Sequence, residues 1–418
     1  MPRMFHRIGA IVAVVVVLAA CSRSPAPAAR EPGQAAWLGD ISQVQVPAAP
    51  GSRYPHLAAT QDGSTVVMNW LEPGAEPTYR LRQSRWTVGN GWGPPGTVAA
   101  SGDWFINWAD FPSVVPLDAS HWVAHWLHQR PGDVYSYDVM TSLSDDAGET
   151  WSAPYSPHDD GTPTEHGFVS MASLGGQPYA IWLDGRKTGS GHGEHDGHGA
   201  GAMTLRAARL SPGGATLGAE IDASVCDCCQ TDVAAVRGGL IVVYRDRTAA
   251  EVRDIQAARY VDGQWSESGP VHEDGWRIEA CPVNGPAVAA RDDDVAVAWF
   301  TAPDRPRVRL AFSRDGGRTF SAPVEVASGR VVGRVDVVLL DGGRAVVSWL
   351  ADSSGGAVIR AQPFTMQGPA GPAVDIASSD VARSSGFPQM LAVDGGLLFA
   401  WTESAATPAV RTAFAPLH

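Results

Sequence analysis

The sequence predicts an all-β fold, a seven-bladed β-propeller of four-stranded antiparallel blades. The first observation is a repeated β-hairpin, in which an apolar run, a polar turn and an alternating run end in an aromatic residue. These aromatic residues are Trp70, Trp126, Trp182, Tyr244, Trp299, Trp349 and Trp401, separated by 56, 56, 62, 55, 50 and 52 positions. The second observation is a third strand after every hairpin. A repeat of about 50 residues is typical of propeller blades, and a six-bladed ring with one degenerate repeat is the alternative.

The N-terminal residues have the pattern of a secretory signal peptide. Arg3 and Arg7 are followed by an apolar run over residues 8–20, which is too short to span a bilayer comfortably. The run ends in the letters LAAC, which resemble the lipobox of bacterial lipoproteins, where the cysteine is lipidated. Cys21 is therefore the expected lipidation site, and an ordinary signal peptide with a chance cysteine is the alternative.

We expect residues 1–20 to be a signal peptide, 21–36 a lipidated flexible tether rich in Pro and Ala, and 37–418 a single propeller domain. The protein is then attached to a membrane through its lipid, in the cell envelope, at the outer membrane or at a periplasmic or extracellular face. A net charge of -13 argues against nucleic acid and anionic membrane surfaces as partners. A monomer is expected.

Alternating apolar and polar residues predict the third strand of each blade. The predicted third strands are residues 79–85, 134–144, 203–210, 254–261, 307–313, 357–364 and 409–415. Six of them are followed by a fourth strand, but the last repeat ends the chain. Residues 35–46, before the first repeat, supply the missing strand and close the ring.

Two turns between third and fourth strands share one pattern. The stretches SDDAGETW (144–151) and SRDGGRTF (313–320) both read Ser-x-Asp-x-Gly-x-Thr-aromatic. Ser and Asp side chains bond nearby backbone N–H groups, and Gly supplies a positive φ. The pattern resembles the Asp-box, or BNR, repeats of sialidase-like propellers. Asp146 and Asp315 are accordingly expected to be structural.

Four cysteines are predicted to meet on the face opposite the Asp-box turns. Cys226, Cys228 and Cys229 lead into the fourth blade, and Cys281 leads into the fifth at nearly the same level. Four thiolates suit zinc or copper(I). In an oxidising compartment disulfides are the default alternative, and free redox thiols are a third possibility.

A Gly-rich loop between residues 184 and 203 leaves the third blade on the same face. It carries His192, His195 and His198, and Met203 adds a soft ligand at its end. The sequence therefore predicts a Cys/His site that binds copper or zinc, in a binding or redox role. The alternative for the loop alone is a solvated segment without a ligand.

The resemblance to sialidases implies a second hypothesis, hydrolysis of an acidic glycan. Such enzymes hold a sugar carboxylate with three arginines and use a Tyr nucleophile activated by Glu, with an Asp as acid/base. Arg53-Tyr54-Pro55 resembles their Arg-Ile-Pro motif. The candidate substrate-binding residues are Arg53, Asp110, Arg245, Arg253 and Arg334.

Two departures weaken the hydrolase hypothesis. The family's nucleophile comes late in the chain, whereas no Tyr follows Tyr260 here, and the family has six blades. For each arginine taken singly, a surface salt bridge is the alternative. A scaffold stapled by disulfides, which binds another envelope protein, is the third function class.

Overall fold

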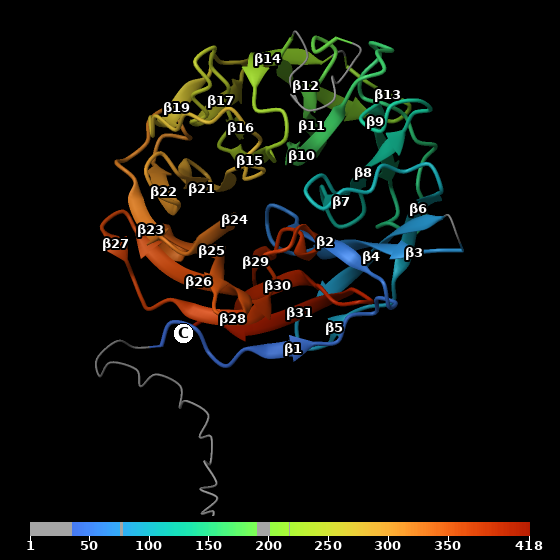
Figure 1. Ribbon diagram of the computed structural model, residues 1–418. Helices are drawn as coiled ribbons and strands as arrows, with labels where there is room; N and C mark the ends of the chain where they lie inside the picture. The colour runs from blue at the N-terminus through green and yellow to red at the C-terminus, as the bar shows by residue number, and fades with distance from the viewer. Residues whose placement is uncertain (1–35, 76–77, 190–200, 217) are drawn as a thin grey trace, which may run out of the picture. The chain divides into compact units, whose positions relative to one another are not determined.

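Residues 35–418 form one compact unit, a ring of seven antiparallel sheets around a common centre (Figure 1). The structure is a computed structural model and describes residues 36–75, 78–189, 201–216 and 218–418. Within these residues no helix has the length and apolar character needed to cross a membrane. The predicted fold class, an all-β seven-bladed propeller, is confirmed.

The first three blades follow the chain from the N-terminal side. Blade 1 consists of β2 (Arg53–Ala59), β3 (Val66–Pro73), β4 (Tyr79–Thr87), β5 (Gly91–Trp92) and β6 (Gly96–Ser101). Blade 2 consists of β7 (Ser113–Pro116), β8 (Trp122–Gln129) and β9 (Tyr137–Ser144). Blade 3 consists of β10 (His166–Leu174), β11 (Gln177–Asp184), β12 (Met203–Ser211), β13 (Gly214–Ala215) and β14 (Ala219–Val225).

The next three blades repeat this order. Blade 4 consists of β15 (Asp232–Val236), β16 (Gly239–Arg245), β17 (Ile255–Val261), β18 (Gln264–Trp265) and β19 (Gly269–His272). Blade 5 consists of β20 (Ala287–Arg291), β21 (Asp294–Thr301), β22 (Arg307–Ser313) and β23 (Val324–Ser328). Blade 6 consists of β24 (Val331–Leu340), β25 (Arg344–Ser353), β26 (Gly356–Thr365), β27 (Gly368–Pro369) and β28 (Val374–Ser379).

Blade 7 joins both ends of the described chain. It consists of β29 (Gln389–Val393), β30 (Gly396–Glu403), β31 (Ala409–Pro416) and the N-terminal β1 (Ser42–Val44). β1 pairs antiparallel with β31, and an isolated bridge joins Leu38 to Leu417 (Figure 1). The ring is thus closed by hydrogen bonds between residues more than 360 positions apart, for example between the Thr412 hydroxyl and the Val44 carbonyl.

Blade 2 differs from the four-stranded expectation. Its sheet has three strands, and in place of a regular fourth strand a single bridge joins Thr141 to Tyr155. The segment after this bridge, which contains two Pro residues, continues into the loop that leads to blade 3. Pro lacks the N–H that a strand ladder needs, which explains the short pairing.

The apolar core lies between the blades. Each cluster of buried side chains combines residues from two neighbouring sheets, as in blades 3 and 4, where Leu183 and Leu205 pack with Leu240 and Tyr244. The aromatic residues that end the hairpins are buried there, and those of blades 1, 3, 4 and 5 donate a hydrogen bond to a carboxylate. The Trp182 indole N–H donates to Asp184 over 2.8 Å, for example. Burial of alternate residues on both sheet faces explains the hairpin pattern in the sequence.

Both Asp-box turns have the same hydrogen bonds. The Asp146 carboxylate accepts from the Thr150 backbone N–H at 2.8 Å and from its hydroxyl at 2.6 Å. The corresponding distances from Thr319 to Asp315 are 3.0 and 2.7 Å. Gly317 has a φ of 81°, and a Cβ there would lie 2.1 Å from Ile241. Only glycine therefore fits this turn.

Buried carboxylates connect neighbouring blades near the axis. Asp110 accepts the Phe168 N–H at 2.8 Å, Asp232 accepts that of Val288 at 2.7 Å, and Asp336 accepts that of Met390 at 2.7 Å. Each bond runs from a residue at the start of one blade to the inner strand of the next. These bonds fix the angle between blades and so position the loops at the ends of the strands.

Candidate metal centre

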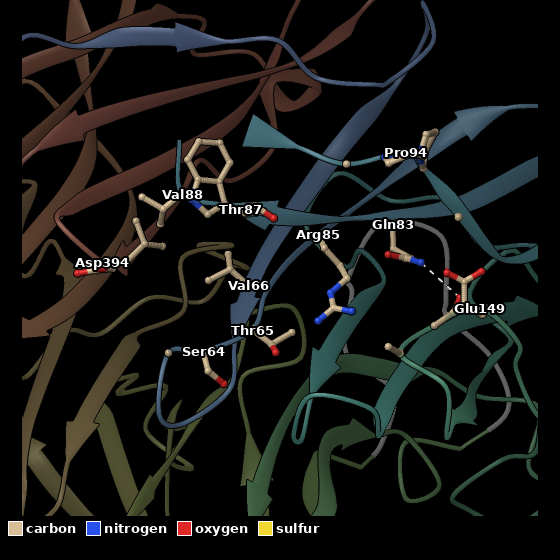
Figure 2. Close-up of a pocket in the computed structure, with 18 residues that line it drawn as sticks. Ser64, Thr65, Val66, Gln83, Arg85, Thr87, Val88, Pro94, Glu149 and Asp394 are labelled. Atoms are coloured by element: carbon tan, nitrogen blue, oxygen red, sulfur yellow. Dashed lines mark hydrogen bonds between the residues drawn. The ribbon is translucent and has the colours of Figure 1, made fainter. Parts of the chain in front are cut away.

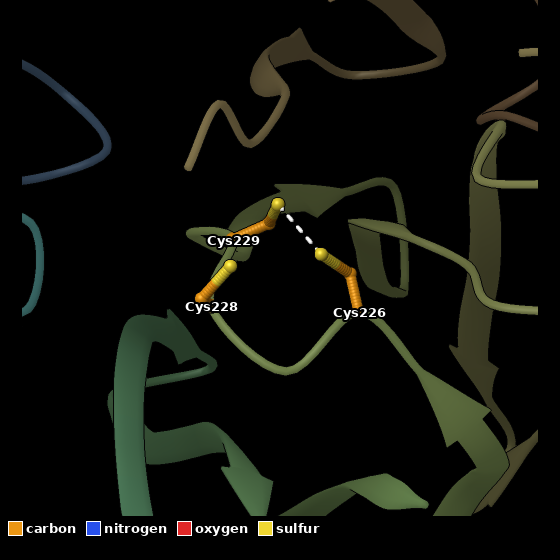
Figure 3. A group of neighbouring side chains, drawn as sticks. All are labelled: Cys226, Cys228 and Cys229. Carbon is orange, nitrogen blue, oxygen red and sulfur yellow. Dashed lines mark hydrogen bonds between the residues drawn. The ribbon is translucent and has the colours of Figure 1, made fainter. Parts of the chain in front are cut away.

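Three thiols meet in the loop between β14 and β15, at the junction of blades 3 and 4 (Figure 3). The sulfur atoms of Cys226, Cys228 and Cys229 all lie within 4.8 Å of one another. The Cys226 and Cys229 sulfurs are 2.8 Å apart. Cys226 and Cys229 are 1% and 2% exposed, whereas Cys228 is half-buried. This group is called the thiol cluster below.

Hydrogen bonds from the surrounding blades shape the loop that carries the thiol cluster. The Cys226 N–H donates to the Arg245 carbonyl of β16 over 3.0 Å. On the other side of the loop, the Gln230 side-chain amide donates to the Ala109 carbonyl over 2.8 Å, and the Thr231 hydroxyl donates to the Phe168 carbonyl over 2.9 Å. The thiols are therefore held at fixed positions by the ring before any ligand binds.

Buried arginines surround the thiol cluster with positive charge. Arg253 is 0% exposed, and its Nη1 lies 3.4 Å from the Cys226 sulfur. Glu251 holds the same guanidinium at 2.7 Å. Arg247 lies close by and pairs with Asp227, the residue between the first two cysteines, at 3.0 Å. A cation this close favours the thiolate form of a cysteine.

The pKa values of the three thiols move in different directions. Burial raises the pKa of the Cys226 thiol, but hydrogen bonds from Cys228 and Cys229 and the Arg253 guanidinium outweigh it, so the net pKa is well below the usual value. The pKa of Cys228 is raised by its hydrogen bonds to Cys226, Cys229 and Cys281. Burial, followed by the bond to Cys226, raises the pKa of Cys229. Cys226 is thus the member of the cluster that most favours the thiolate form.

Cys281 lies outside the thiol cluster but next to it. It is exposed, in the loop between β19 and β20 that leads into blade 5. Its thiol is one of the groups that raise the pKa of Cys228. All four described cysteines are free thiols in this structure. The disulfide hypothesis and the four-thiolate hypothesis stay predictions.

The predicted histidine ligands, His192, His195 and His198, lie outside the described residues, as does Cys21. The strands that flank the histidine loop are described. Met203, at the start of β12, pairs with Val225, the residue before Cys226. The described end of that loop therefore lies one strand away from the thiol cluster.

The guanidinium groups of two arginines predicted to bind a substrate carboxylate already bond to protein carbonyl and hydroxyl groups. Arg245 is 1% exposed, and its guanidinium donates to the Asn284, Arg253 and Phe300 carbonyls at 2.6 to 3.0 Å. Arg334 lies over the Trp108 ring and donates to the Ser385 hydroxyl and the Gly386 carbonyl. Here both side chains brace loops.

The remaining candidates for substrate binding also have partners within the protein. Arg53 stacks on Tyr79, and Arg253 belongs to the surroundings of the thiol cluster. Asp110 is the blade-connecting carboxylate described above. The carboxylate clamp stays a prediction.

Tyr137 and Glu165, which the sequence did not single out, form an acidic group with Asp110. The Tyr137 hydroxyl lies 3.4 Å from Asp110 Oδ2 and 3.3 Å from Glu165 Oε1. Burial raises the pKa of Asp110 to about 7 and that of Glu165 to about 8. Burial and the two carboxylates raise the pKa of Tyr137 well above its usual value. A nucleophilic Tyr needs the opposite shift and a surface that a substrate can reach, and Tyr137 is 1% exposed.

A second buried group of possible metal ligands lies between blades 2 and 3. It consists of Asp138, His158, Asp160, His166 and Asp184. The two imidazole rings stack with centroids 3.9 Å apart and planes 7° from parallel. A metal binds in the plane of an imidazole ring, so one ion cannot take its lone pairs from both parallel rings in this arrangement.

Existing partners also occupy that second group. His158 Nε2 accepts the Val139 N–H at 3.2 Å. The Arg186 guanidinium lies 3.0 Å from Asp160 and 2.6 Å from Asp184, where a cation would sit. This group is an ion-pair network that joins two blades, and the thiol cluster is the better candidate for a metal centre.

Two hollows lie elsewhere in the ring. One of about 1170 Å³ follows the inner strands and includes the carboxylates of Asp232 and Asp336 in its lining. The other, of about 620 Å³, lies between β4 and the turns of blades 2 and 7, where Gln83 donates to Gly148 (Figure 2). The described linings of both hollows do not include the cysteines.

Comparison with known proteins gives likeness of fold only. No family model and no curated protein matches the sequence. Among solved structures, the K499G mutant of NanB sialidase from Streptococcus pneumoniae is 10% identical, with 90% of this chain and 94% of that chain covered and a TM-score of 0.47. Trypanosoma rangeli sialidase is 13% identical, with 78% and 56% covered and a TM-score of 0.45. At such identities the likeness says nothing about activity.

Proposed function

We propose that this protein binds a transition-metal ion, copper(I) or zinc, through the thiolates of Cys226, Cys228 and Cys229. The observation that supports the proposal is the meeting of three sulfur atoms within 4.8 Å, in a loop fixed by the ring. Thiolates are the ligands that soft cations prefer. A site already assembled needs little reorganisation when the ion arrives.

The donor set favours copper(I) over zinc. Structural zinc is almost always bound by four ligands, whereas copper(I) is stable with two or three thiolates. The thiol cluster supplies three sulfurs, two of them nearly inaccessible to water. Zinc would need a fourth ligand, and Cys281, the nearest further thiol, is exposed.

The surrounding charge supports a bound ion. Three thiolates and one monovalent ion carry two net negative charges, which are costly to bury without compensation. Arg253 and Arg247 are already paired with Glu251 and Asp227, so the buried Arg245, whose guanidinium bonds only to carbonyls, is the cation that offsets part of that charge. Metal binding then releases protons from the two thiols whose pKa values are raised.

The proposed cellular setting is the cell envelope. The signal-peptide pattern and the lipobox-like stretch ending in Cys21 support an anchored, extracytoplasmic protein. In this setting the protein would hold a soft metal at a membrane surface, in a binding or redox role.

The test is metal analysis of the full chain, produced in a bacterial envelope and purified in detergent. We expect about one copper per chain by elemental mass spectrometry, and four titratable thiols after the metal is removed under reducing-agent-free, anaerobic conditions. Cys229→Ser should lower the amount of copper that the cluster retains, because only two of its three thiolates remain.

The matched control carries His192→Ala, His195→Ala and His198→Ala, so that metal on the histidine loop is not mistaken for metal on the thiols. This variant should keep the copper bound by the cluster. Two disulfides without metal would contradict the proposal and favour the stapled scaffold. Release of sialic acid from a fluorogenic sialoside by a metal-free sample would favour the hydrolase instead.

A further inference from the structure

The four thiols are graded by exposure from solvent to interior. Cys281 is exposed, Cys228 is half-buried, and Cys226 and Cys229 are 1% and 2% exposed. Cys281 lies in the loop that contacts the loop of the thiol cluster at Gln230, and Cys228 lies within 4.8 Å of the two buried sulfurs. Each thiol therefore neighbours the next one inward.

The loop that carries Cys281 is fixed against the loop of the thiol cluster. The Gly285 N–H donates to the Gln230 side-chain carbonyl over 3.1 Å. A Cβ on Gly285 would lie 2.1 Å from the Gln230 backbone carbonyl, so the two loops touch backbone to backbone. Arg245 holds the neighbouring Asn284 carbonyl at 2.8 Å. The order of the four thiols follows from this contact between blades 4 and 5.

On this basis, and resting on the proposed function, we propose that Cys281 is the capture ligand of a thiol relay. It takes copper(I) from an external donor and passes it through Cys228 to Cys226 and Cys229. A donor complex reaches the exposed sulfur of Cys281, whereas the two buried sulfurs offer it almost no surface.

The transfer is ligand exchange, and its atoms and charges balance. At each step one new copper–sulfur bond forms as one bond to the previous ligand breaks. The incoming thiol gives its proton to water or to the departing ligand, and copper remains in the +1 state. No electron is transferred, so no oxidant or reductant is needed. Successive exchange between neighbouring thiolates avoids a free ion, which would be costly in a buried site.

The relay assigns different roles to Cys281 and Cys229. Removal of Cys281 should slow loading without changing how much copper is bound at equilibrium, because the three cluster sulfurs remain. Removal of Cys229 should instead lower the equilibrium affinity for copper, because only two cluster sulfurs remain. If Cys281 were instead a permanent fourth ligand, its removal would lower the equilibrium affinity.

The experiment mixes the metal-free full chain with copper(I)–bicinchoninate in a stopped-flow instrument without oxygen and follows loss of the donor's colour. We expect Cys281→Ser to load about tenfold more slowly than the unmodified protein, with unchanged final copper, which corresponds to about 1.4 kcal/mol in the barrier. Cys281→Met keeps a soft sulfur ligand and should restore most of the rate. Ser268→Ala is the control, because Ser268 is exposed and directly precedes β19, and it should have no effect on the loading rate.

The outcomes separate the relay from the proposed function. If the unmodified protein takes no copper from the donor, the proposed function fails and the relay with it. If the unmodified protein binds copper and Cys281→Ser loads at the same rate, the relay alone is overturned. Loss of equilibrium copper in Cys281→Ser would also overturn it, since Cys281 would then be a permanent ligand.

Discussion

Arg253 is the side chain that most affects the chemistry of the thiol cluster. Its guanidinium is fully buried, lies 3.4 Å from the Cys226 sulfur and is held in place by Glu251. A buried cation beside a sulfur stabilises the thiolate, and little water is present to screen the interaction. The low pKa of Cys226 therefore depends in part on this one residue.

Arg253→Gln should raise the pKa of Cys226 in the metal-free protein. Because an opposite charge at this range lowers a pKa by one unit or more, we expect the ultraviolet thiolate absorbance to appear at a pH about one unit higher or more. Arg237→Gln is the control, since Arg237 is 66% exposed and pairs with Asp293 at the surface. Superimposable titrations of the Arg253 variant and the unmodified protein would show that the cation does not set this pKa.

Gly167 shows how closely the acidic group near the axis is packed. A Cβ at this position would lie 2.0 Å from Asp110 Oδ2 and 2.9 Å from the Tyr137 ring. Both neighbours are buried and cannot move freely. Any side chain at residue 167 would therefore displace the carboxylate that joins blades 2 and 3.

Gly167→Ala should lower the free energy of unfolding by about 1–3 kcal/mol, the usual cost of overpacking a core. Urea unfolding followed by tryptophan fluorescence measures the change. Gly269→Ala is the matched control, because a Cβ at Gly269, in β19, meets nothing within 4 Å. Equal stability of the two variants would mean that the Asp110 region relaxes without cost.

At the scale of elements, the blades are joined by carboxylates that titrate abnormally. Burial raises the pKa of Asp110, Asp232 and Asp336 to about 7 each. In an unfolded chain such groups have a pKa near 3.8. Between these two values the folded state binds more protons than the unfolded state. The contribution of each carboxyl to stability is therefore present at low pH and is lost as pH rises from about 4 to about 7.

Asp232→Asn removes one of these titrations from the junction of blades 4 and 5. The variant loses one hydrogen bond at every pH, but it does not lose stability through ionisation at this site. We expect its free energy of unfolding to rise relative to that of the unmodified protein by about 1 kcal/mol or more between pH 4 and pH 8. Urea unfolding at several pH values measures this difference.

The control for that series is Asp375→Asn, which changes an exposed carboxylate on β28 paired with Arg360. Its difference from the unmodified protein should stay within about 0.5 kcal/mol at all pH values. A parallel pH profile for Asp232→Asn would mean that the buried carboxyl does not retain its proton in the folded state.

The strands were more predictable than the contacts between blades. Local alternation and the aromatic ends of the hairpins predict the sheet of each blade, because both arise from burial within a few residues of chain. The group of His158, His166 and Asp184 was not predicted, since His158 comes from the loop after blade 2, whereas His166 and Asp184 face each other on β10 and β11 of blade 3. Likewise the spacing of Cys226 and Cys229 is local, but the exposure of Cys281 depends on how two blades pack.

At the scale of the whole molecule, the ring is closed by the N-terminal segment. Trp37 is 7% exposed, packs in the cluster shared by blades 6 and 7, and its indole N–H donates to the Pro372 carbonyl over 2.9 Å. The Trp37 carbonyl also accepts the His418 N–H at 3.2 Å. Trp37 thus connects the segment before β1 with His418 through its backbone and with blade 6 through its side chain.

Trp37→Ala should weaken the closure and destabilise all seven blades together, since an open ring exposes the faces of its two end blades. We expect a loss of about 3–5 kcal/mol, the usual cost of removing a large buried aromatic side chain. Urea unfolding should remain a single transition when followed both by circular dichroism and by tryptophan fluorescence, because neighbouring blades share their cores. Val88→Ala, at a side chain that is 53% exposed, should change stability by less than about 0.5 kcal/mol. If Trp37→Ala unfolded blade 7 in a separate early step, the blades would be independently stable, and closure of the ring would not hold the loops around the thiol cluster in place.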